Sequence, residues 1–293
     1  MQSVLILGST GMLGSMCLDY LSKQSDISLC ASDRKNDYYT PIKYPEVKLK
    51  FFEASKIDEK AQLLEDQQYI INCIGITKPD IDEKNPENAI FVNSLFPHKL
   101  SKIIHKEARI IQICTDCVYS GEDGDYDENA PYSPTDIYGR TKCLGEVESA
   151  RVYNLRTSII GPDGKGKFLF DKVKNAGTER WFGYTNHLWN GITTLAFSKI
   201  CYGIIKNDLN LIDTFQHIVP ADVVTKNELV KIIAEVYGVE IDLTPKEDFN
   251  SIDRTLATNK PTTNEGIWKL AGYDKIPTIE EMIRELKEYE ERK

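Results

Sequence analysis

The sequence predicts an α/β fold: a doubly wound parallel sheet of the Rossmann type, followed by a smaller C-terminal lobe. Three observations predict it. Residues 4–7 form a short apolar run that breaks directly into a glycine-rich turn and then into an amphipathic helical pattern. Strand-like runs then recur with helical patterns between them, which is typical of a parallel sheet. After Gly161 and Pro162 this alternation stops, so we expect the second lobe there.

The expected elements follow in order along the chain. Strands are expected at residues 4–7, 27–31, 49–52, 69–73, 110–114 and 152–155. Helices are expected at residues 12–23, 58–65, 89–105 and 138–150, and then at 168–174 and 193–205. Capping boxes at Thr225 and Thr278 each open a further helix, the first of which closes at Gly238. We therefore predict a dinucleotide-binding Rossmann domain at residues 1–160. Residues 161–293 should be mainly a substrate-binding lobe, with possible return segments to the first domain.

Composition limits the class of protein. The chain has 293 residues, of which 41% are hydrophobic and 28% charged, as in an ordinary soluble enzyme. Its net charge of −9, with both signs interspersed, argues against nucleic acid or an anionic membrane as a partner. The seven cysteines lie mostly in apolar segments, and Cys114 and Cys117 have no second pair to complete a metal site. We expect a reduced, cytoplasmic protein with no bound metal.

The glycine turn has the spacing Gly8-x-x-Gly11-x-x-Gly14 between a strand and a helix. Its exposed N–H groups and the helix N-terminus attract a pyrophosphate, so we predict a dinucleotide there. The predicted cofactor-binding residues of the turn are Gly8, Ser9, Thr10, Gly11, Met12, Leu13 and Gly14. After the second strand, Asp33 suits a ribose 2′-hydroxyl, whereas Arg34 and Lys35 could hold a 2′-phosphate. This pattern favours NADP, with NAD possible.

A Tyr-x-x-x-Lys pair on a helix places both side chains on one face, where the ammonium favours the tyrosinate and the phenol can exchange a proton with a carbonyl oxygen. The pattern occurs five times, at Tyr39/Lys43, Tyr44/Lys48, Tyr138/Lys142, Tyr202/Lys206 and Tyr289/Lys293. The first two contain a proline and the last two lie outside the sheet pattern. Only Tyr138 follows a strand end that carries a hydroxyl, at Thr115, where ligands bind in such sheets. Thr115, Tyr138 and Lys142 are therefore the candidate catalytic residues.

Further motifs occur at residues 115–121, 126–128, Pro134, 138–142 and 145–146, together with 72–75, Asn93, Pro97 and 156–158. These motifs resemble the extended short-chain dehydrogenase/reductase family, and within it the dTDP-4-dehydrorhamnose reductase branch of sugar-nucleotide reductases. The resemblance is continuous over roughly the first 160 residues and patchy beyond. Cys114 stands where the family usually has a serine, and Cys73-Ile74-Gly75 replaces a run of alanines. Residues 181–191 are unlike the rhamnose enzyme.

The resemblance implies reduction of the keto group of a nucleotide-linked 4-keto-6-deoxy sugar by NAD(P)H, as in surface polysaccharide biosynthesis. Tyr138 would protonate the alkoxide, Lys142 would keep the tyrosine pKa low and hold the nicotinamide ribose, and Thr115 would bond the carbonyl oxygen. Further cofactor-binding residues implied are Cys73, Ile74, Gly75 and Asn93. A homodimer is possible.

The substrate side is less determined. The segment 181–191 is rich in aromatic and amide residues, and reads either as a packed loop or as a wall that stacks on the base and contacts the sugar. The predicted substrate residues are Thr115, Asp116, Trp181, Asn186, Trp189, Asn190 and Arg254. Arg254 suits a diphosphate, although such an arginine is more often a surface ion pair.

Two other functions stay open on the same motifs. An epimerase, or a combined epimerase and reductase, would share the tyrosine–lysine pair but would retain its cofactor instead of consuming it. A non-catalytic NAD(P)-binding regulatory subunit would keep only the fold.

Overall fold

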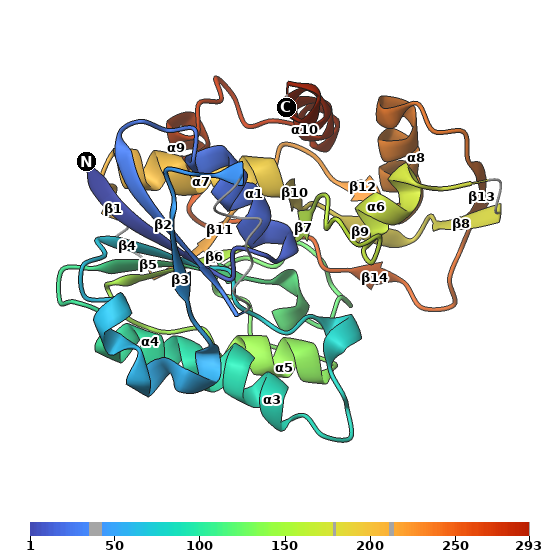
Figure 1. The fold of residues 1–293 in the computed structure, drawn as a ribbon. Coiled ribbons are helices and arrows are strands. Elements are labelled where there is room, and N and C mark those ends of the chain that lie inside the picture. The colour runs from blue at the N-terminus through green and yellow to red at the C-terminus, as the bar shows by residue number, and fades with distance from the viewer. Residues whose placement is uncertain (35–42, 178–179, 211–213, 293) are drawn as a thin grey trace.

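The computed structural model describes residues 1–34, 43–177, 180–210 and 214–292. Its centre is a seven-stranded sheet in the order β11-β6-β5-β4-β1-β2-β3, with every neighbouring pair parallel (Figure 1). The strands are β1 (Gln2–Leu7), β2 (Ile27–Asp33), β3 (Lys48–Phe51), β4 (Tyr69–Asn72), β5 (Arg109–Cys114), β6 (Val152–Arg156) and β11 (Phe215–His217). The predicted doubly wound architecture is confirmed. The seventh strand, β11, was not predicted and comes from the C-terminal half.

Helices cover both faces of this sheet (Figure 1). One face carries α1 (Met12–Leu21), α7 (Thr194–Lys206) and α9 (Pro261–Leu270). The other carries α3 (Glu87–Ile90), α4 (Phe96–Ile103) and α5 (Ile137–Leu144), and a π-helical turn at Phe91–Leu95 joins α3 to α4. Because helices shield both faces of the sheet from water, the strand sequences are continuous apolar runs.

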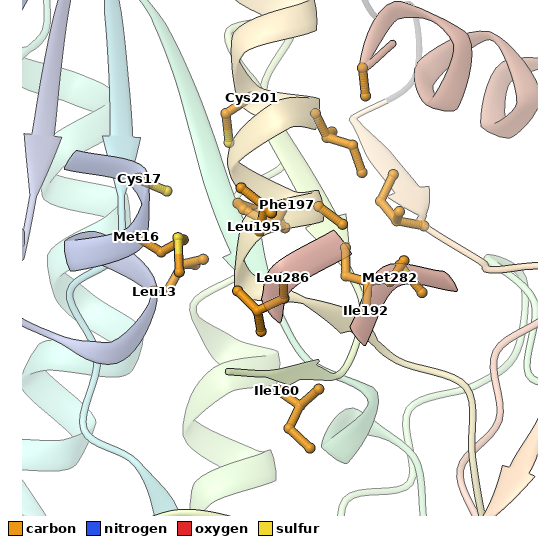
Figure 2. Close-up of a cluster of buried hydrophobic side chains, with 14 of the residues drawn as sticks. Leu13, Met16, Cys17, Ile160, Ile192, Leu195, Phe197, Cys201, Met282 and Leu286 are labelled. Atoms are coloured by element: carbon orange, nitrogen blue, oxygen red, sulfur yellow. The ribbon is translucent and has the colours of Figure 1, made fainter. Parts of the chain in front are cut away.

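The main core joins the two halves of the chain. Leu13, Met16 and Cys17 of α1 lie toward α7, where Leu195, Phe197 and Cys201 are buried (Figure 2). Met282 and Leu286 of α10 (Ile279–Glu291) extend the same cluster. Because α7 and β11 return to the sheet, only part of residues 161–293 forms a separate lobe.

That lobe contains two small sheets. One has the order β12-β9-β14 and the other pairs β13 with β8. The elements are α6 (Leu169–Lys174), β8 (Arg180–Tyr184), β9 (His187–Trp189), β12 (Val224–Thr225), α8 (Lys226–Tyr237), β13 (Asp242–Lys246) and β14 (Ile252–Asp253). A short parallel pair, β7 (Ile159–Ile160) with β10 (Ile192–Thr193), connects the lobe to the end of β6. Both predicted capping boxes are present, at Thr225 and Thr278, and α8 ends at Gly238 as expected.

Two predicted helices are wrong in extent. Residues 58–65 contain 3-10 turns, from η1 (Ala54–Glu59) and η2 (Ala61–Leu63). Of the side chains described at 58–65 only Leu64 is buried, so no continuous apolar stripe supports an α-helix. The helix predicted at 138–150 ends at Leu144. Beyond it, the amide of Asn154 accepts from the Val147 N–H at 3.3 Å and donates to its carbonyl at 2.8 Å, so β6 uses the backbone groups that a longer helix would need.

Candidate active site

The three glycines of the first turn differ in whether the backbone structure requires glycine at their positions. Gly8 has a φ of +78°, a conformation that L residues rarely adopt, and a Cβ on Gly14 would clash with the Gly8 carbonyl. The fold therefore requires glycine at both positions. Gly11 has an ordinary φ of −81° and is exposed, and a Cβ there would make only a normal contact, 3.5 Å from the Gly8 oxygen. Nothing in the described part of the protein requires glycine at position 11, so its predicted role in cofactor binding stays a prediction.

The N-terminus of α1 is the natural anion site of this turn. Among the described residues no side chain caps α1, so the first-turn N–H groups of Met12 and Leu13 are left for a ligand. Ser9 serves the turn itself, because its N–H and hydroxyl both donate to the Ser32 carbonyl, at 3.1 and 2.9 Å. Of the predicted turn residues, Ser9 is thus a framework residue.

The end of β2 carries the residues predicted to choose the cofactor. Asp33 is buried, and its Oδ1 accepts from the Arg34 N–H at 2.6 Å and from the Thr10 hydroxyl at 3.4 Å. Arg34 is exposed and forms no ion pair with another of the described residues. Lys35 lies outside the described residues.

The loop after β4 forms the next part of the predicted cofactor site. Asn93 was predicted to bind cofactor, but the structure gives its side chain another task. Its Oδ1 accepts from the Ile76 N–H at 2.8 Å, and its Nδ2 donates to the Ile76 carbonyl at 2.9 Å and to the Thr141 hydroxyl at 3.1 Å. Asn93 therefore ties the loop that carries Cys73, Ile74 and Gly75 to α5. It shapes that loop and is not free to contact a cofactor.

The start of α5 places Tyr138 at the carboxyl edge of the sheet. Asp136 caps the helix by accepting from the Gly139 N–H at 2.7 Å. A Cβ on Gly139 would clash with the Cys117 carbonyl, so only glycine lets α5 approach the turn η5 (Asp116–Val118) this closely. As a result Tyr138 lies beside Thr115, close enough for the threonine hydroxyl to affect its pKa.

The electrostatics around Tyr138 differ from the prediction. Burial, followed by the nearby Cys117 thiol, raises the pKa of Tyr138, and the hydrogen bond with Thr115 opposes that rise. Lys142, four residues on, is buried and donates from Nζ to the Ile113 carbonyl at 2.8 Å. The expectation that Lys142 keeps the pKa of Tyr138 low is therefore wrong for the protein alone. The phenol is protonated at neutral pH, as a proton donor must be.

Thr115 already has two local partners. Its hydroxyl donates to Asp116 Oδ1 at 3.0 Å and accepts from the Cys117 N–H at 3.2 Å. Burial raises the pKa of Cys117 to about 12 and raises that of Cys114 as well, so both thiols are neutral and unreactive. In the described part of the chain, no group of His, Cys, Asp and Glu side chains could hold a metal ion. None of the described helices is long and apolar enough to cross a bilayer.

On the substrate side, the lobe brings Trp189 and Arg254 toward the strand end that carries Asp116. Trp189 is buried and donates from Nε1 to the Ser158 hydroxyl at 2.8 Å, just after β6. Arg254 donates from Nε to the Tyr119 carbonyl at 3.0 Å, directly beyond η5. These two predicted residues therefore border the same region as Thr115 and Tyr138.

Three other predicted substrate residues have structural tasks instead. Trp181 lies in β8, at the outer end of the lobe in Figure 1, where it packs against the core. The Asn186 amide donates to the Asp248 carbonyl at 2.8 Å and accepts from its N–H at 3.0 Å. The Asn190 amide does the same with Leu256, at 2.7 and 2.9 Å. The structure thus gives Trp181, Asn186 and Asn190 structural partners, and a substrate role for this segment stays a prediction.

One residue near the site was missed from the sequence. Lys226 is the first residue of α8, and its Nζ lies 5.2 Å from the centre of the Trp189 ring. The capping box at Thr225 predicts that Lys226 begins a helix. The approach of that helix end to Trp189 depends on the pairing of β12 with β9, which no local sequence pattern indicates.

A network of buried polar side chains lies next to the site. Arg156, only 2% exposed, pairs with the Glu146 carboxylate at 2.6 Å and donates to the Tyr119 hydroxyl at 3.2 Å. His217 Nε2 lies 3.2 Å from Arg156 Nη1 and 3.3 Å from the same tyrosine hydroxyl. These bonds hold the segment after η5 in place. Asp116 and Cys117, the first residues of η5, lie near Tyr138.

Comparison with known proteins identifies the family. Residues 1–181 match the model of the RmlD substrate binding domain. The chain belongs to this family. The resemblance to the dTDP-4-dehydrorhamnose reductase branch of the extended short-chain dehydrogenase/reductases is thereby confirmed.

Three relatives show the range of functions around this RmlD-family chain. It is 28% identical over 273 residues to the probable low-salt glycan biosynthesis reductase Agl14 of Haloferax volcanii, covering 86% of each chain. It is 28% identical over 156 residues to the methionine adenosyltransferase 2 subunit beta of Danio rerio, covering 50% of this chain and 43% of that one. The solved dTDP-4-dehydrorhamnose reductase of Bacillus anthracis, in complex with NADP, has a TM-score of 0.74 at 20% identity and covers 99% of this chain and 100% of that one. At that identity the likeness concerns the fold.

Proposed function

We propose that this chain reduces the keto group of a nucleotide-linked 4-keto-6-deoxy sugar with NAD(P)H. The observation that carries the proposal is the close contact of α5 with η5 at Gly139, which places a protonated Tyr138 beside Thr115 at the same sheet edge as the uncapped glycine turn. The names of the Haloferax volcanii and Bacillus anthracis proteins support a reductase, and the former supports a role in glycan synthesis.

The chain's own residues have defined tasks in this reaction. A bound reduced nicotinamide supplies the hydride to the carbonyl carbon. The Thr115 hydroxyl turns from Asp116 to donate to the carbonyl oxygen and stabilises its developing charge. Tyr138 donates its proton to that oxygen, which completes the alcohol. Lys142, buried on the same helix, would turn from the Ile113 carbonyl to hold the nicotinamide ribose.

The test is single-turnover oxidation of bound NADPH after addition of a dTDP-4-keto-6-deoxy sugar. Changing Tyr138→Phe removes only the hydroxyl and should slow the reaction about 10²- to 10⁴-fold, the usual worth of general acid catalysis. Tyr202→Phe is the matched control, because Tyr202 belongs to another tyrosine–lysine pair and donates to Asp26 away from the site. Equal rates in the two variants would remove Tyr138 as the acid. A parent protein that oxidises NADPH with no nucleotide ketosugar would instead favour the binding-subunit function that the Danio rerio relative's name suggests.

We also propose that NADPH is preferred over NADH. Asp33 is already occupied by Arg34 N–H and Thr10, whereas the exposed Arg34 guanidinium is available for a 2′-phosphate. Changing Arg34→Ala should weaken NADPH binding about 10-fold or more, the worth of a charged hydrogen bond, and leave NADH binding unchanged. Calorimetric titration of both cofactors checks this. An equal loss for the two would assign the choice to Asp33.

A further inference from the structure

The segment between β4 and α3 contains a stretch without a single buried side chain. It follows Ile76, whose N–H and carbonyl are both held by the Asn93 amide, and it ends where α3 begins at Glu87. We call residues 77–86 the strap. Every one of its side chains is exposed or half-buried. Few apolar contacts therefore hold the strap in place, and its position depends on its polar partners.

Two oppositely charged residues of the strap pair with different elements. Lys78 Nζ lies 2.8 Å from Asp136 Oδ2, while Asp136 Oδ1 caps α5, the helix that carries the candidate acid. Asp80 pairs with Lys167, and the Thr77 hydroxyl donates to the other oxygen of the same carboxylate at 2.7 Å. The bonds from Lys167 and Thr77 keep the pKa of the Asp80 carboxyl below its usual value, so it is charged at neutral pH.

The order of the strands shows what the strap crosses. Three neighbouring strands of the large sheet run β6-β5-β4, and the strap follows the end of β4. Its partner helix α5 follows β5 in the chain, and its partner Lys167 follows β6 and β7. A segment that starts at β4 and pairs beyond both β5 and β6 passes the carboxyl end of β5, which carries Thr115. A dinucleotide that extends from the glycine turn to Tyr138 would have its reactive end beneath the strap.

The partner of Asp80 lies in a loop whose backbone is fixed. The Asp163 carboxylate accepts hydrogen bonds from three backbone N–H groups at 2.6, 3.0 and 2.6 Å, those of Lys165, Lys167 and Phe168. The Asp171 carboxylate in turn accepts from the Asp163 N–H at 2.9 Å. The other partner of the strap is fixed by its role as a helix cap. When the ion pairs break, the strap is therefore the part that moves.

We propose that the strap closes over a dinucleotide bound at this edge of the sheet, and that Lys78 and Asp80 are positioning residues whose ion pairs set how long the dinucleotide stays bound. The inference rests on the proposed function for the identity of the ligand. The Lys78 side chain is 64% exposed and that of Asp80 is 51% exposed, so both pairs are weak and can break without unfolding the protein. A segment that must open to release a ligand needs contacts of this kind.

The test measures the dissociation rate of NADPH by stopped flow, from the loss of its fluorescence when excess NADP⁺ displaces it. Asp80→Asn keeps the shape of the side chain and removes its charge. We expect NADPH to dissociate about 2- to 5-fold faster from this variant, the range that one exposed ion pair supplies. The matched control is Glu235→Gln, which removes one carboxylate from an exposed ion pair with Lys231 on α8. The control should release NADPH at the parent's rate.

A charge exchange separates the ion pair from other effects of the substitution. Asp80→Lys places a second ammonium beside Lys167 and should speed dissociation more than Asp80→Asn does. Adding Lys167→Glu recreates the pair in reverse and should return the rate to within about 2-fold of the parent's. Amide hydrogen exchange without NADPH gives a readout that needs no ligand. Mass spectrometry should show faster exchange over residues 77–86 in Asp80→Asn than in the parent.

The proposal is overturned if NADPH leaves Asp80→Asn at the parent's rate, or if Glu235→Gln speeds its release as much. It is also overturned if the charge exchange restores nothing, or if exchange over the strap is the same in the variant and the parent. A strap that responds as expected in a protein that never oxidises NADPH with a ketosugar would keep this inference and lose the proposed reaction. Normal ketosugar reduction with an unresponsive strap would do the reverse.

Discussion

At the scale of single residues, the three glycines of the first turn have different structural roles although they lie only three residues apart. Gly8 and Gly14 are required by the backbone itself, through a positive φ and through a contact that leaves no room for a Cβ. Gly11 lies between them with an ordinary backbone and open space. A spacing pattern predicts all three together, but only the coordinates separate the two glycines that the turn requires from the one that it does not.

This separation predicts opposite results for two substitutions. Gly11→Val should abolish NADPH binding while changing the free energy of unfolding by no more than about 0.5 kcal/mol, as for other exposed positions. Gly14→Ala should destabilise the fold by about 1–3 kcal/mol, because its methyl group meets the Gly8 carbonyl. Urea unfolding and calorimetric titration measure the two effects. Normal NADPH affinity in Gly11→Val would show that no dinucleotide binds at this turn.

At the scale of elements, α5, the helix that carries Tyr138, is held at both ends. Its N-terminus is set by the Asp136 cap and by the close contact of Gly139 with Cys117. Just after its C-terminus, Glu146 pairs with Arg156 of β6 in a site where both side chains are only 2% exposed. The π-helical turn on the neighbouring helix adds the Asn93 bond to Thr141. Tyr138 therefore lies on an element with little freedom to shift.

The buried ion pair predicts a non-additive response. Arg156→Met leaves the Glu146 carboxylate buried without its partner, which should cost about 3–5 kcal/mol of unfolding free energy. Adding Glu146→Leu removes that charge, and the double variant should regain much of the loss. Urea unfolding of both single variants and the double variant tests the cycle. Additive losses would mean that packing, and not the uncompensated charge, sets the cost.

At the scale of the whole molecule, the C-terminal half completes the first domain. β11 pairs with β6 and places His217 at the junction, fully buried. One ring nitrogen, Nδ1, lies 2.8 Å from the Ala257 carbonyl, so it carries the proton, and Nε2 accepts from Arg156. This neutral ring therefore connects the lobe side of the chain to the network beneath η5.

A pH dependence of stability follows from this placement. Burial lowers the pKa of His217 below its ordinary value, so between the two values the unfolded chain binds more protons than the folded one. Stability should therefore fall as pH drops below about 6.5, by at most about 1.4 kcal/mol per pH unit from this group. The pKa of Glu128 is also lowered, despite its burial, by bonds from the His217 N–H and its neighbours, and its contribution is lost at more acidic pH.

The measurement is urea unfolding of the parent and of His217→Gln between pH 7 and pH 5. The variant should be less stable at pH 7 but should lose less free energy on acidification. Parallel curves for the two proteins would mean that His217 does not titrate in this range.

Much of the fold and part of the site could be predicted from local patterns. Strand periodicity, the glycine turn and the capping boxes are decided by neighbours a few residues apart, and six strands of the large sheet followed from them. The choice of Tyr138 among five tyrosine–lysine pairs also needed only its place after a hydroxyl-bearing strand end. The predictions failed where a side chain forms hydrogen bonds with backbone groups that are distant in the sequence. The residues adjacent in the sequence do not indicate whether an asparagine contacts a substrate or stabilises a loop.

The amino-acid sequence by itself determined the doubly wound class and singled out Thr115, Tyr138 and Lys142 as the candidate catalytic residues. Only the tertiary structure decided the return of β11, the bracing roles of Asn93 and Asn190, and the approach of Lys226 to Trp189. The Asn190 pairing with Leu256 spans 66 residues of chain, so no periodicity or turn rule encodes it. Such contacts form because a buried amide must find partners wherever the packed elements present them, and that depends on the whole fold.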